Sequence, residues 1–467
     1  MPMERRGPQK LNRSQNTQAG PRADQPESKS KFDYKLELET NCWLRISLSA
    51  KDLQKKFNNL FCHFTVVNLR EAFRALDGSK AKGIDGITKR DYARSLDENL
   101  ADLENRLHKG TYRPQAKKGI MIPKANGKQR PIAISAFEDK LVEWLLAKLL
   151  GSVYEPLFIR NSFGFRPRKS AHDAVKAAYC SLKDDKRPHV VEIDLARFFD
   201  TVSHRKLMRL MKRRITDPRM HGLIARFLKA GVLDQDGNLK TSDTGTPQGS
   251  VMSPVLANVF LHYALDSWFL ENYAAKGAII VRYADDAVFI FEKEQAANDF
   301  KTALKGRLEA FGLELNEDKS GITQFGKRQG NVFHFLGFTF CWGKTKGTGK
   351  AVLKVHTQKT KLFKKIQDYT DWLKENRSRL KLDDIWRITA AKLRGHYNYY
   401  GVTTNRPKIN HFYYSVIDNL FKWLNRRSQR KSFTWDRFAK RLQYNPLPAP
   451  PALALLKPLT DWTTYAY

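Results

Sequence analysis

Two short apolar runs flank a pair of acidic residues between positions 278 and 291. The first run is rich in β-branched residues and ends at Tyr283, and the second begins after Asp286. Apolar runs of this length on either side of a short polar step predict a β-hairpin with Asp285 and Asp286 at its tip. Aspartate is common in turns because its side chain accepts hydrogen bonds from nearby backbone. Taken alone, the pair therefore predicts no more than a turn.

A third aspartate follows a separate apolar run. Residues 189–194 are typical of a β-strand that ends at Asp194. If this strand lies beside the hairpin, three carboxylates meet at one edge of a sheet. Mg²⁺ prefers oxygen ligands, and three carboxylates can hold two metal ions about 3.5–4 Å apart. This pattern favours phosphoryl transfer, in which positioning and charge neutralisation supply most of the catalysis.

Turn and cap signals predict several further elements. Asn126-Gly127 predicts a second hairpin within residues 119–134. Ser170 is a candidate helix N-cap, and Ser253 is another, with Pro254 at the first helical position. Apolar stripes at helical spacing indicate helices near residues 66–76, 92–107 and 300–311 and across residues 354–441.

The charge of the chain narrows the class of partner. Lysine and arginine number 83 against 48 acidic residues among 467, a net charge of +35. Such a charge indicates a polyanionic partner and favours nucleic acid. An anionic membrane surface is the alternative, but no apolar run reaches the roughly 20 residues needed to span a bilayer. The first 30 residues are polar, without a signal peptide, and the four scattered cysteines fit a reducing bacterial cytoplasm.

The acidic motifs together resemble a known family. Tyr283-Ala284-Asp285-Asp286, with Asp194 and Phe198-Phe199-Asp200 upstream, is similar to the reverse transcriptases encoded by bacterial group II introns. Further motifs of this family match over residues 66–440. They are Gly-Ile-Asp-Gly at 83–86, the runs at 161–174 and 244–254, the run at 333–338, and the run at 393–401.

The resemblance implies an α+β fold of the right-hand polymerase type. Fingers and palm, an antiparallel sheet with helices, would occupy residues 32–342, and an α-helical thumb or maturase domain residues 351–445. Between them, the Gly/Lys-rich residues 343–350 are interpreted as a linker. Residues 1–31 are interpreted as a disordered basic tail and residues 446–467 as a Pro-rich tail. The sequence lacks the His-Asn-His and cysteine motifs of the endonuclease domain found in many members.

The resemblance also implies an activity and its cofactors. The protein would be an RNA-directed DNA polymerase that uses two Mg²⁺ ions, with Mn²⁺ as a substitute. Asp194, Asp285 and Asp286 would hold the ions, with the backbone carbonyl of Leu195 as a further ligand. The substrates would be deoxynucleoside triphosphates, an RNA template such as intron RNA, and a DNA or RNA primer.

Four residues are candidates for contact with the incoming nucleotide. Lys124 and Arg130, on the predicted basic hairpin, would hold the triphosphate, since arginine grips phosphate with two donors and lysine supplies a point charge. Gln248 would face the nucleotide from a loop in which Ser250 replaces the family's usual glycine. Phe199 would lie beneath the sugar, while Phe198 packs in the core, because neighbouring positions on an extended chain face opposite ways.

The remaining candidates would contact the template and primer strands. Most of them are basic, and their simplest alternative is a solvated surface; for the apolar ones it is core packing. Residues 354–441 contain 22 Lys/Arg against seven Asp/Glu, which favours binding to a polyanion. The candidates are Arg166, Arg168 and Lys169 for the template, Leu336, Gly337 and Phe338 for the primer, and Arg394, Arg426, Arg427, Arg430 and Lys431 for the nucleic-acid duplex.

Two alternative functions stay open. The chain is compatible with a maturase that stabilises folded intron RNA, with or without polymerisation, although a pure RNA-binding protein has no need of three carboxylates. It is also compatible with an RNA-templated RNA polymerase, which shares the palm and its acidic hairpin. The sequence leaves open whether the protein serves a mobile intron or has been recruited to defence or repair. It also leaves open the priming mode and the oligomeric state.

Overall fold

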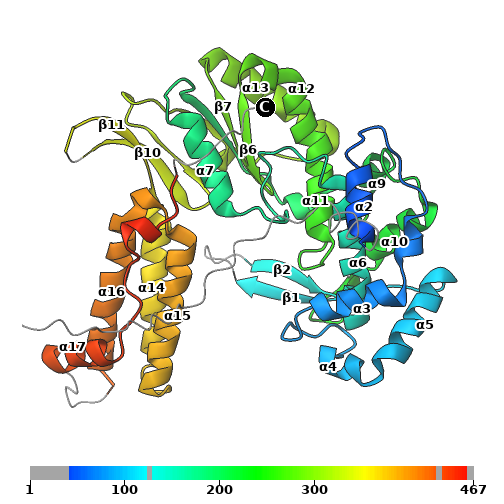
Figure 1. The fold of residues 1–467 in the computed structure, drawn as a ribbon, viewed down its shortest axis with the longest axis horizontal. Helices are drawn as coiled ribbons and strands as arrows, with labels where there is room; N and C mark the ends of the chain where they lie inside the picture. Colours follow the sequence, from blue (N-terminus) through cyan, green and yellow to red (C-terminus); the bar gives the residue numbers. More distant parts are fainter. Residues whose placement is uncertain (1–40, 124–128, 346, 428–433, 460–467) are drawn as a thin grey trace, which may run out of the picture.

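The structure is a computed structural model that describes residues 41–123, 129–345, 347–427 and 434–459. Lys124, Arg430, Lys431 and the expected tail at residues 1–31 lie outside the described residues. Figure 1 shows an arch: a mainly helical N-terminal part on one side, a sheet-containing part at the top, and a helical C-terminal part on the other side.

The N-terminal part is built around one long buried helix, α6 (Phe137–Tyr154). Leu141, Leu145 and Leu149 are fully buried and anchor the shared core. The expected stripe at Leu100, Leu103 and Leu107 is also buried, although a break after Tyr92 divides that segment in two. The smaller helices here are α2 (Cys42–Ser49), α3 (Val66–Ala75), α4 (Lys89–Tyr92) and α5 (Leu96–His108).

A hairpin projects from this part toward the C-terminal helices (Figure 1). Strands β1 (Lys117–Pro123) and β2 (Gln129–Ile134) pair antiparallel, as predicted from the Asn126-Gly127 signal. Strand β1 also pairs with a small ribbon made of β4 (Val232–Leu233) and β5 (Leu239–Lys240). At the base of β1, the buried Lys117 forms an ion pair with Glu143 of α6, which fixes the hairpin to the core.

The central sheet has the strand order β6-β7-β3-β8. Successive side chains of its strands face opposite sides. Phe289 and Phe291 of β7 therefore pack with Phe300 of α13 on one face, at ring-centroid distances of 4.5 and 5.1 Å. Val288 and Ile290 pack on the other face in the cluster that includes α7. The strands are β3 (His189–Ile193), β6 (Ile279–Tyr283), β7 (Asp286–Phe291) and β8 (Gly321–Gln324).

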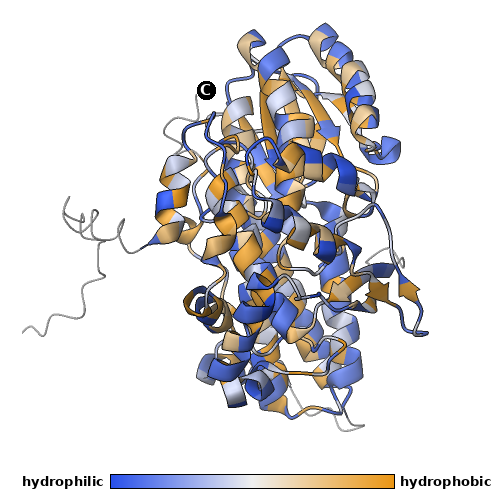
Figure 2. Ribbon diagram, turned by 90° about the vertical axis from the view of Figure 1, so that its right-hand side faces the viewer, coloured by the Kyte–Doolittle hydropathy of each residue, from blue (hydrophilic) through white to orange (hydrophobic). Residues whose placement is uncertain are grey.

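Between Ala171 and Phe311 the chain also forms seven α-helices and one π-helical turn, and of these α9 and α10 lie beside α2 and α6 (Figure 1). Figure 2 shows the strands as mostly hydrophobic and the outer helix faces as hydrophilic. The helices are α7 (Ala171–Leu182), α8 (Phe198–Thr201), α9 (His204–Met211), α10 (Pro218–Lys229), α11 (Ser253–Leu261), α12 (Ser267–Tyr273) and α13 (Glu294–Phe311), and a π-helical turn, His262–Asp266, joins α11 to α12.

The interpretation of residues 343–350 as a linker is wrong. Gly343 and Lys344 pair with Val352 and Ala351, so the described residues of this range belong to a hairpin formed by β10 (Phe338–Lys344) and β11 (Ala351–Thr357). A third strand, β9 (Val332–Phe335), completes this small sheet. Glycine and lysine suit a polar turn as well as a linker, and only the long-range pairing of the strands distinguishes the two.

The C-terminal part therefore begins at residue 359 and consists of helices with a core of their own. Leu373, Leu393 and Leu420 are fully buried in it. Its helices are α14 (Lys359–Asn376), α15 (Leu382–Tyr400), α16 (Arg406–Leu424) and α17 (Trp435–Tyr444). The architecture confirms the α+β class with a helical part after the sheet.

No helix in the described part of the chain is both long enough and apolar enough to cross a membrane.

Candidate active site

The predicted hairpin carries the acidic residues at its tip. Tyr283 of β6 pairs with Asp286 of β7, which leaves a two-residue turn. We call residues 284–286 the acidic turn. Ala284 has a φ of +56°, in the left-handed region that residues with a side chain seldom adopt. Asp194 directly follows β3, and the register Ile193↔Ala287 places it next to Asp286. The structure thus brings the three predicted aspartates to one edge of the sheet.

Burial and mutual repulsion set the protonation of the acidic turn. Burial, the neighbouring Asp285 and then Asp194 raise the pKa of Asp286 to about 7. Burial likewise raises the pKa of Asp285, with Asp194 adding to it, while the residue's own backbone N–H and the charge of Arg130 act in the opposite direction. A carboxylate with a raised pKa is one whose charged form lacks compensation. A bound cation would supply that compensation.

Asp194 is held differently from the other two. Its Oδ2 accepts hydrogen bonds from Lys319 Nζ and from Asn316 Nδ2, both at 2.9 Å. Its backbone N–H donates to Ser320 Oγ at 3.2 Å. Neither Lys319 nor Asn316 was expected from the sequence as a site residue; their only signal is the short polar run before β8.

The three carboxylates suit hard divalent cations, because carboxylate oxygens are the ligands such ions prefer. Among the described residues, no group of three His, Cys, Asp or Glu side chains is gathered as a ready metal site. The carboxylate of Asp194 forms an ion pair with Lys319. The next residue, Leu195, is buried, and its backbone forms a β-bridge with Leu315.

A cavity of about 590 Å³ opens beside the acidic turn. Asp194 and Asp286 line it together with the predicted primer residues Leu336 and Gly337 and with Lys361 of α14. The positive charge of Lys361 partly opposes the rise in the pKa of Asp286. Phe338, the third predicted primer residue, is fully buried and stacks on Tyr399 at 5.9 Å. Its side chain packs inside the protein, next to Leu336 and Gly337 in the chain, and is not exposed for contact with a primer.

The two adjacent phenylalanines differ in burial, as predicted. Phe198 is buried against Phe260. Phe199 is partly buried, and its ring meets Phe165 edge-on at 6.4 Å. The reason given from the sequence was wrong, however, because both residues lie in the short helix α8 and not on an extended chain. Their different directions follow from helical geometry.

The Gln248 loop packs against both β2 and Phe199. Ala133 N–H donates to the carbonyl of Gln248 at 2.7 Å, and Thr246 N–H donates to the carbonyl of Phe199 at 2.7 Å. Gly249 has a φ of +109°, and an added Cβ would lie 2.7 Å from the Ala133 carbonyl oxygen. Glycine is therefore required here. Ser250, which replaces the family's glycine, is buried.

Ser253 does not cap α11 as predicted. The helix begins at Ser253 itself, after Met252, and has no side-chain cap. The hydroxyl of Ser253 instead donates to the Pro247 carbonyl at 2.9 Å. A serine before Pro254 satisfies the N-cap signal in the sequence, but here the hydroxyl closes the loop and leaves the helix uncapped.

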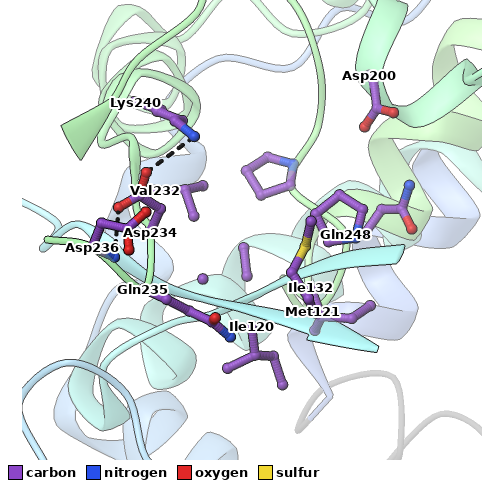
Figure 3. A pocket seen from close by; sticks show the side chains of 14 residues that line it. Ile120, Met121, Ile132, Asp200, Val232, Asp234, Gln235, Asp236, Lys240 and Gln248 are labelled. Carbon is purple, nitrogen blue, oxygen red and sulfur yellow. Dashed lines mark hydrogen bonds and ion pairs between the residues drawn. The ribbon is translucent and has the colours of Figure 1, made fainter. Parts of the chain in front are cut away.

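Gln248 also borders a second cavity, of about 450 Å³, shown in Figure 3. Its walls are the β1–β2 hairpin, the β4–β5 ribbon and the Gln248 loop. An ion pair between Lys240 and Asp234, at 3.0 Å, closes one side. The labelled apolar residues of the wall are Ile120, Met121, Ile132 and Val232.

Some of the predicted basic side chains are exposed and available to bind phosphate, whereas others are buried and bonded within the protein. Arg130 is exposed on β2 and close enough to lower the pKa of Asp285. Arg168 is exposed before α7. Arg166 is buried, and its guanidinium donates to Glu155 and to the carbonyls of Ile159 and Ser162. Lys169 is half-buried, and burial lowers its pKa to about 8.

The C-terminal helices carry the remaining predicted cations. Arg394 and Arg426 are exposed. The Arg426 guanidinium lies 4.9 Å from the centroid of the Trp423 ring, a cation–π distance. Arg427 is also exposed and donates to the Leu380 carbonyl at 3.2 Å.

Comparison with known proteins places the chain in a family. Residues 122–340 match the family described as reverse transcriptase (RNA-dependent DNA polymerase). Protein YkfC of Escherichia coli is 33% identical over 278 residues, covering 52% of this chain and 73% of the relative. Group II intron-encoded protein LtrA of Lactococcus lactis is 28% identical over 457 residues, covering 78% and 74%. The matched segment contains all three aspartates, Phe199 and Gln248, and the chain belongs to the group II-like reverse transcriptases.

Proposed function

We propose that this RNA-directed DNA polymerase uses Asp194, Asp285 and Asp286 to hold two divalent metal ions, physiologically Mg²⁺, with Mn²⁺ as a substitute. The observation that carries the proposal is the side-by-side placement of Asp194 and Asp286, together with the raised pKa of Asp286. When bound, such ions activate the primer 3′ oxygen and stabilise the charge that develops on the leaving pyrophosphate. Pocket shape and donor placement then determine which nucleotide reacts.

The surrounding residues would position the nucleotide. Arg130, exposed and near Asp285, would bind the triphosphate through charge-assisted hydrogen bonds. Gln248, whose backbone is fixed to β2, would contact the nascent base pair. Phe199 would form the floor beneath the sugar. Lys319 and Asn316 would orient Asp194, and the Leu195 carbonyl would be a further metal ligand.

The large substrates would lie along the arch. We assign the N-terminal part and the β1–β2 hairpin to the fingers, the central sheet to the palm and the helices from residue 359 to the thumb. The RNA template would approach Arg168 on the fingers side, and the primer end would lie over Leu336 and Gly337 beside the acidic turn. The exposed cations Arg394, Arg426 and Arg427 of the thumb would contact the phosphates of the duplex.

A maturase role is the second candidate function. It is supported by the excess of Lys and Arg over residues 354–441 and by the similarity to an intron-encoded relative. The RNA partner would then be the folded intron itself. In a splicing assay, an Asp285→Ala variant that still supports splicing but not DNA synthesis would separate the two roles.

Primer extension on an RNA template with deoxynucleoside triphosphates tests the polymerase site. Replacing Asp194, Asp285 or Asp286 by alanine should slow extension at least about 1,000-fold, while template–primer affinity stays close to that of the parent. Asp299→Ala, an exposed aspartate on the outer face of α13, is the matched control and should extend normally. Near-parental extension by any of the three variants would remove that residue from the site.

A further inference from the structure

One arginine lies fully buried directly beneath the acidic turn. Arg282 is on β6, two residues before Ala284, and its side chain has no exposed surface. Its guanidinium forms a two-pronged ion pair with Asp266, from Nε to Oδ1 at 2.7 Å and from Nη2 to Oδ2 at 2.6 Å. Asp266 is also fully buried. A buried charge requires such a partner, so the pair is at least a structural element.

The third nitrogen of this guanidinium contacts the acidic turn itself. Arg282 Nη1 donates to the backbone carbonyl of Ala284 at 2.9 Å and to Asn258 Oδ1 at 3.1 Å. The Asn258 amide in turn donates to the Gly164 carbonyl at 2.8 Å. The two-pronged ion pair therefore leaves Nη1 free to donate to the carbonyl of the peptide that joins Ala284 to Asp285.

This contact fixes the direction of the Asp285 amide. The carbonyl of Ala284 and the N–H of Asp285 belong to one planar trans peptide and point opposite ways. Holding the carbonyl inward therefore turns the N–H of Asp285 outward. Ala284 adopts its left-handed φ of +56° in this arrangement, and an alanine needs surrounding contacts to stay there.

Two further segments hold the same turn. The backbone of Arg282 exchanges hydrogen bonds with residues 161–163: its N–H donates to the Asn161 carbonyl at 2.9 Å, and its carbonyl accepts from Phe163 N–H at 2.8 Å. Gly164 lies so close that an added Cβ would collide with the Ala284 backbone nitrogen. On the other side, Asp266 is the last residue of the π-helical turn His262–Asp266. Such turns insert an extra residue and often occur at functional sites.

We propose that Arg282, held by Asp266 and Asn258, is a positioning residue that sets the conformation of the acidic turn for metal binding and catalysis. The inference rests on the proposed metal-binding role of Asp285 and Asp286. Arg282 touches neither substrate nor metal. It acts through the Ala284 peptide, and the π-helical turn is the device that brings Asp266 beneath the hairpin.

The alternative is a purely structural ion pair, and a paired substitution separates the two. Arg282→Met combined with Asp266→Leu removes both charges, so that neither is left buried alone, and exchanges them for apolar side chains of similar size. The hydrogen bond to the Ala284 carbonyl is lost. A structural pair would leave catalysis intact in any folded variant, whereas a positioning pair would not.

The experiment measures the full-length chain with template–primer bound. We expect kcat for nucleotide addition to fall about 10- to 100-fold, with KM for the nucleotide changing less than about threefold. Mn²⁺ affinity, followed by electron paramagnetic resonance, should weaken about tenfold. Arg282→Lys keeps the charge but not the planar fork, so it should fold and still show reduced kcat.

Gly164→Ala disturbs the same turn without touching the ion pair, and it should also lower kcat and Mn²⁺ affinity. It decides the question if the paired variant fails to fold. Leu103→Ala, on the buried face of α5 and distant in sequence from the acidic turn, is the stability control. It should lower the melting temperature without changing kcat or Mn²⁺ affinity.

Parental kcat and Mn²⁺ affinity in the folded paired variant, or in Gly164→Ala if the paired variant does not fold, would overturn the inference. Asp285→Ala, measured in parallel, distinguishes this failure from failure of the proposed function. Activity retained in Asp285→Ala would overturn the metal site itself. Activity lost in Asp285→Ala but unchanged in the paired variant would overturn only the role of Arg282.

Discussion

Asp266 and Asp286 are both carboxylates of the palm, but their charges are compensated differently. Asp266 is fully buried, and Arg282 meets both of its oxygens at 2.6–2.7 Å. Asp286 lies at the tip of the β6–β7 hairpin, the hairpin that carries Arg282. Within the described ranges no lysine or arginine forms an ion pair with Asp286 or with Asp285. Burial, followed by the charges of Asp285 and Asp194, raises the pKa of Asp286 to about 7. The protein supplies its own cation where a charge must be fixed, and it leaves carboxylates uncompensated where an external cation would bind.

The first test of this difference removes the fixed acid. Asp266→Ala leaves the Arg282 charge buried and unpaired, so we expect the free energy of unfolding to fall by about 3–5 kcal/mol. Chemical denaturation monitored by circular dichroism gives the value. A loss below about 1 kcal/mol would mean that water or another group compensates the charge of Arg282. It would contradict the claim that Asp266 fixes this charge.

The second test neutralises the uncompensated acid. Asp286 has a higher pKa in the folded state than in the unfolded chain, so the folded state binds more protons between about pH 4 and pH 7. Stability therefore decreases as pH rises through this range. Without divalent ions, Asp286→Asn should stabilise the protein by on the order of 2 kcal/mol at pH 8 and reduce the pH slope.

Unfolding measured from pH 5 to pH 8 in a chelating buffer checks this expectation. Adding Mg²⁺ should stabilise the parent more than Asp286→Asn, because only the parent retains the full set of ligands. An unchanged pH slope in Asp286→Asn would show that Asp286 is compensated in solution, contrary to the comparison.

The comparison extends to the thumb, where Arg426 and Arg427 are exposed to solvent. Neutralising Arg426, Arg427, Arg430 and Lys431 together should reduce the slope of log affinity against log salt by up to about 3–4, because each phosphate contact releases condensed counterions. Neutralising the exposed Lys51, Lys55 and Lys56 of the fingers is the control and should change the slope less. A parental slope in the thumb variant would identify these cations as a solvated surface.

The last prediction concerns the uncharged wall beside the acidic residues. Phe199→Ala should raise the use of ribonucleotides relative to deoxynucleotides by about tenfold, because a rigid ring excludes the 2′-hydroxyl and a methyl group does not. Phe198→Ala should mainly cost stability, about 3–5 kcal/mol. Single-nucleotide extension with matched triphosphates measures the ratio. Equal use of both sugars by the parent would favour the RNA polymerase alternative.

The sequence predicted those parts of the site that depend on local pattern. Short apolar runs identified β6, β7 and β3, and the turn chemistry placed Asp285 and Asp286 at a hairpin tip. Family motifs then selected Phe199 and Gln248. In the structure, the N–H of Thr246, two residues before Gln248, donates to the Phe199 carbonyl. In these cases the residue type and its neighbours along the chain carry the information.

Contacts between distant segments could not be predicted in this way. Arg282 sits in an apolar strand, Asp266 in an ordinary helical pattern, and nothing along the chain indicates a π-helical turn between α11 and α12. Arg166 carries the same basic signal as Arg168, but its donors are occupied inside the fold. Residues 343–350 fit a linker and a hairpin turn equally well until the pairing of β10 with β11 is known.

Counting bound metal ions tests the central claim most directly. In the complex of full-length protein, RNA template, primer ending in a 3′-deoxy nucleotide, and incoming nucleotide, Mn²⁺ titration followed by electron paramagnetic resonance should reveal about two tightly bound ions per complex. Asp285→Ala should lose at least one of them while still binding template–primer. Parental Mn²⁺ binding in Asp285→Ala, and likewise in Asp194→Ala and Asp286→Ala, would contradict the assignment of the three aspartates as the metal site.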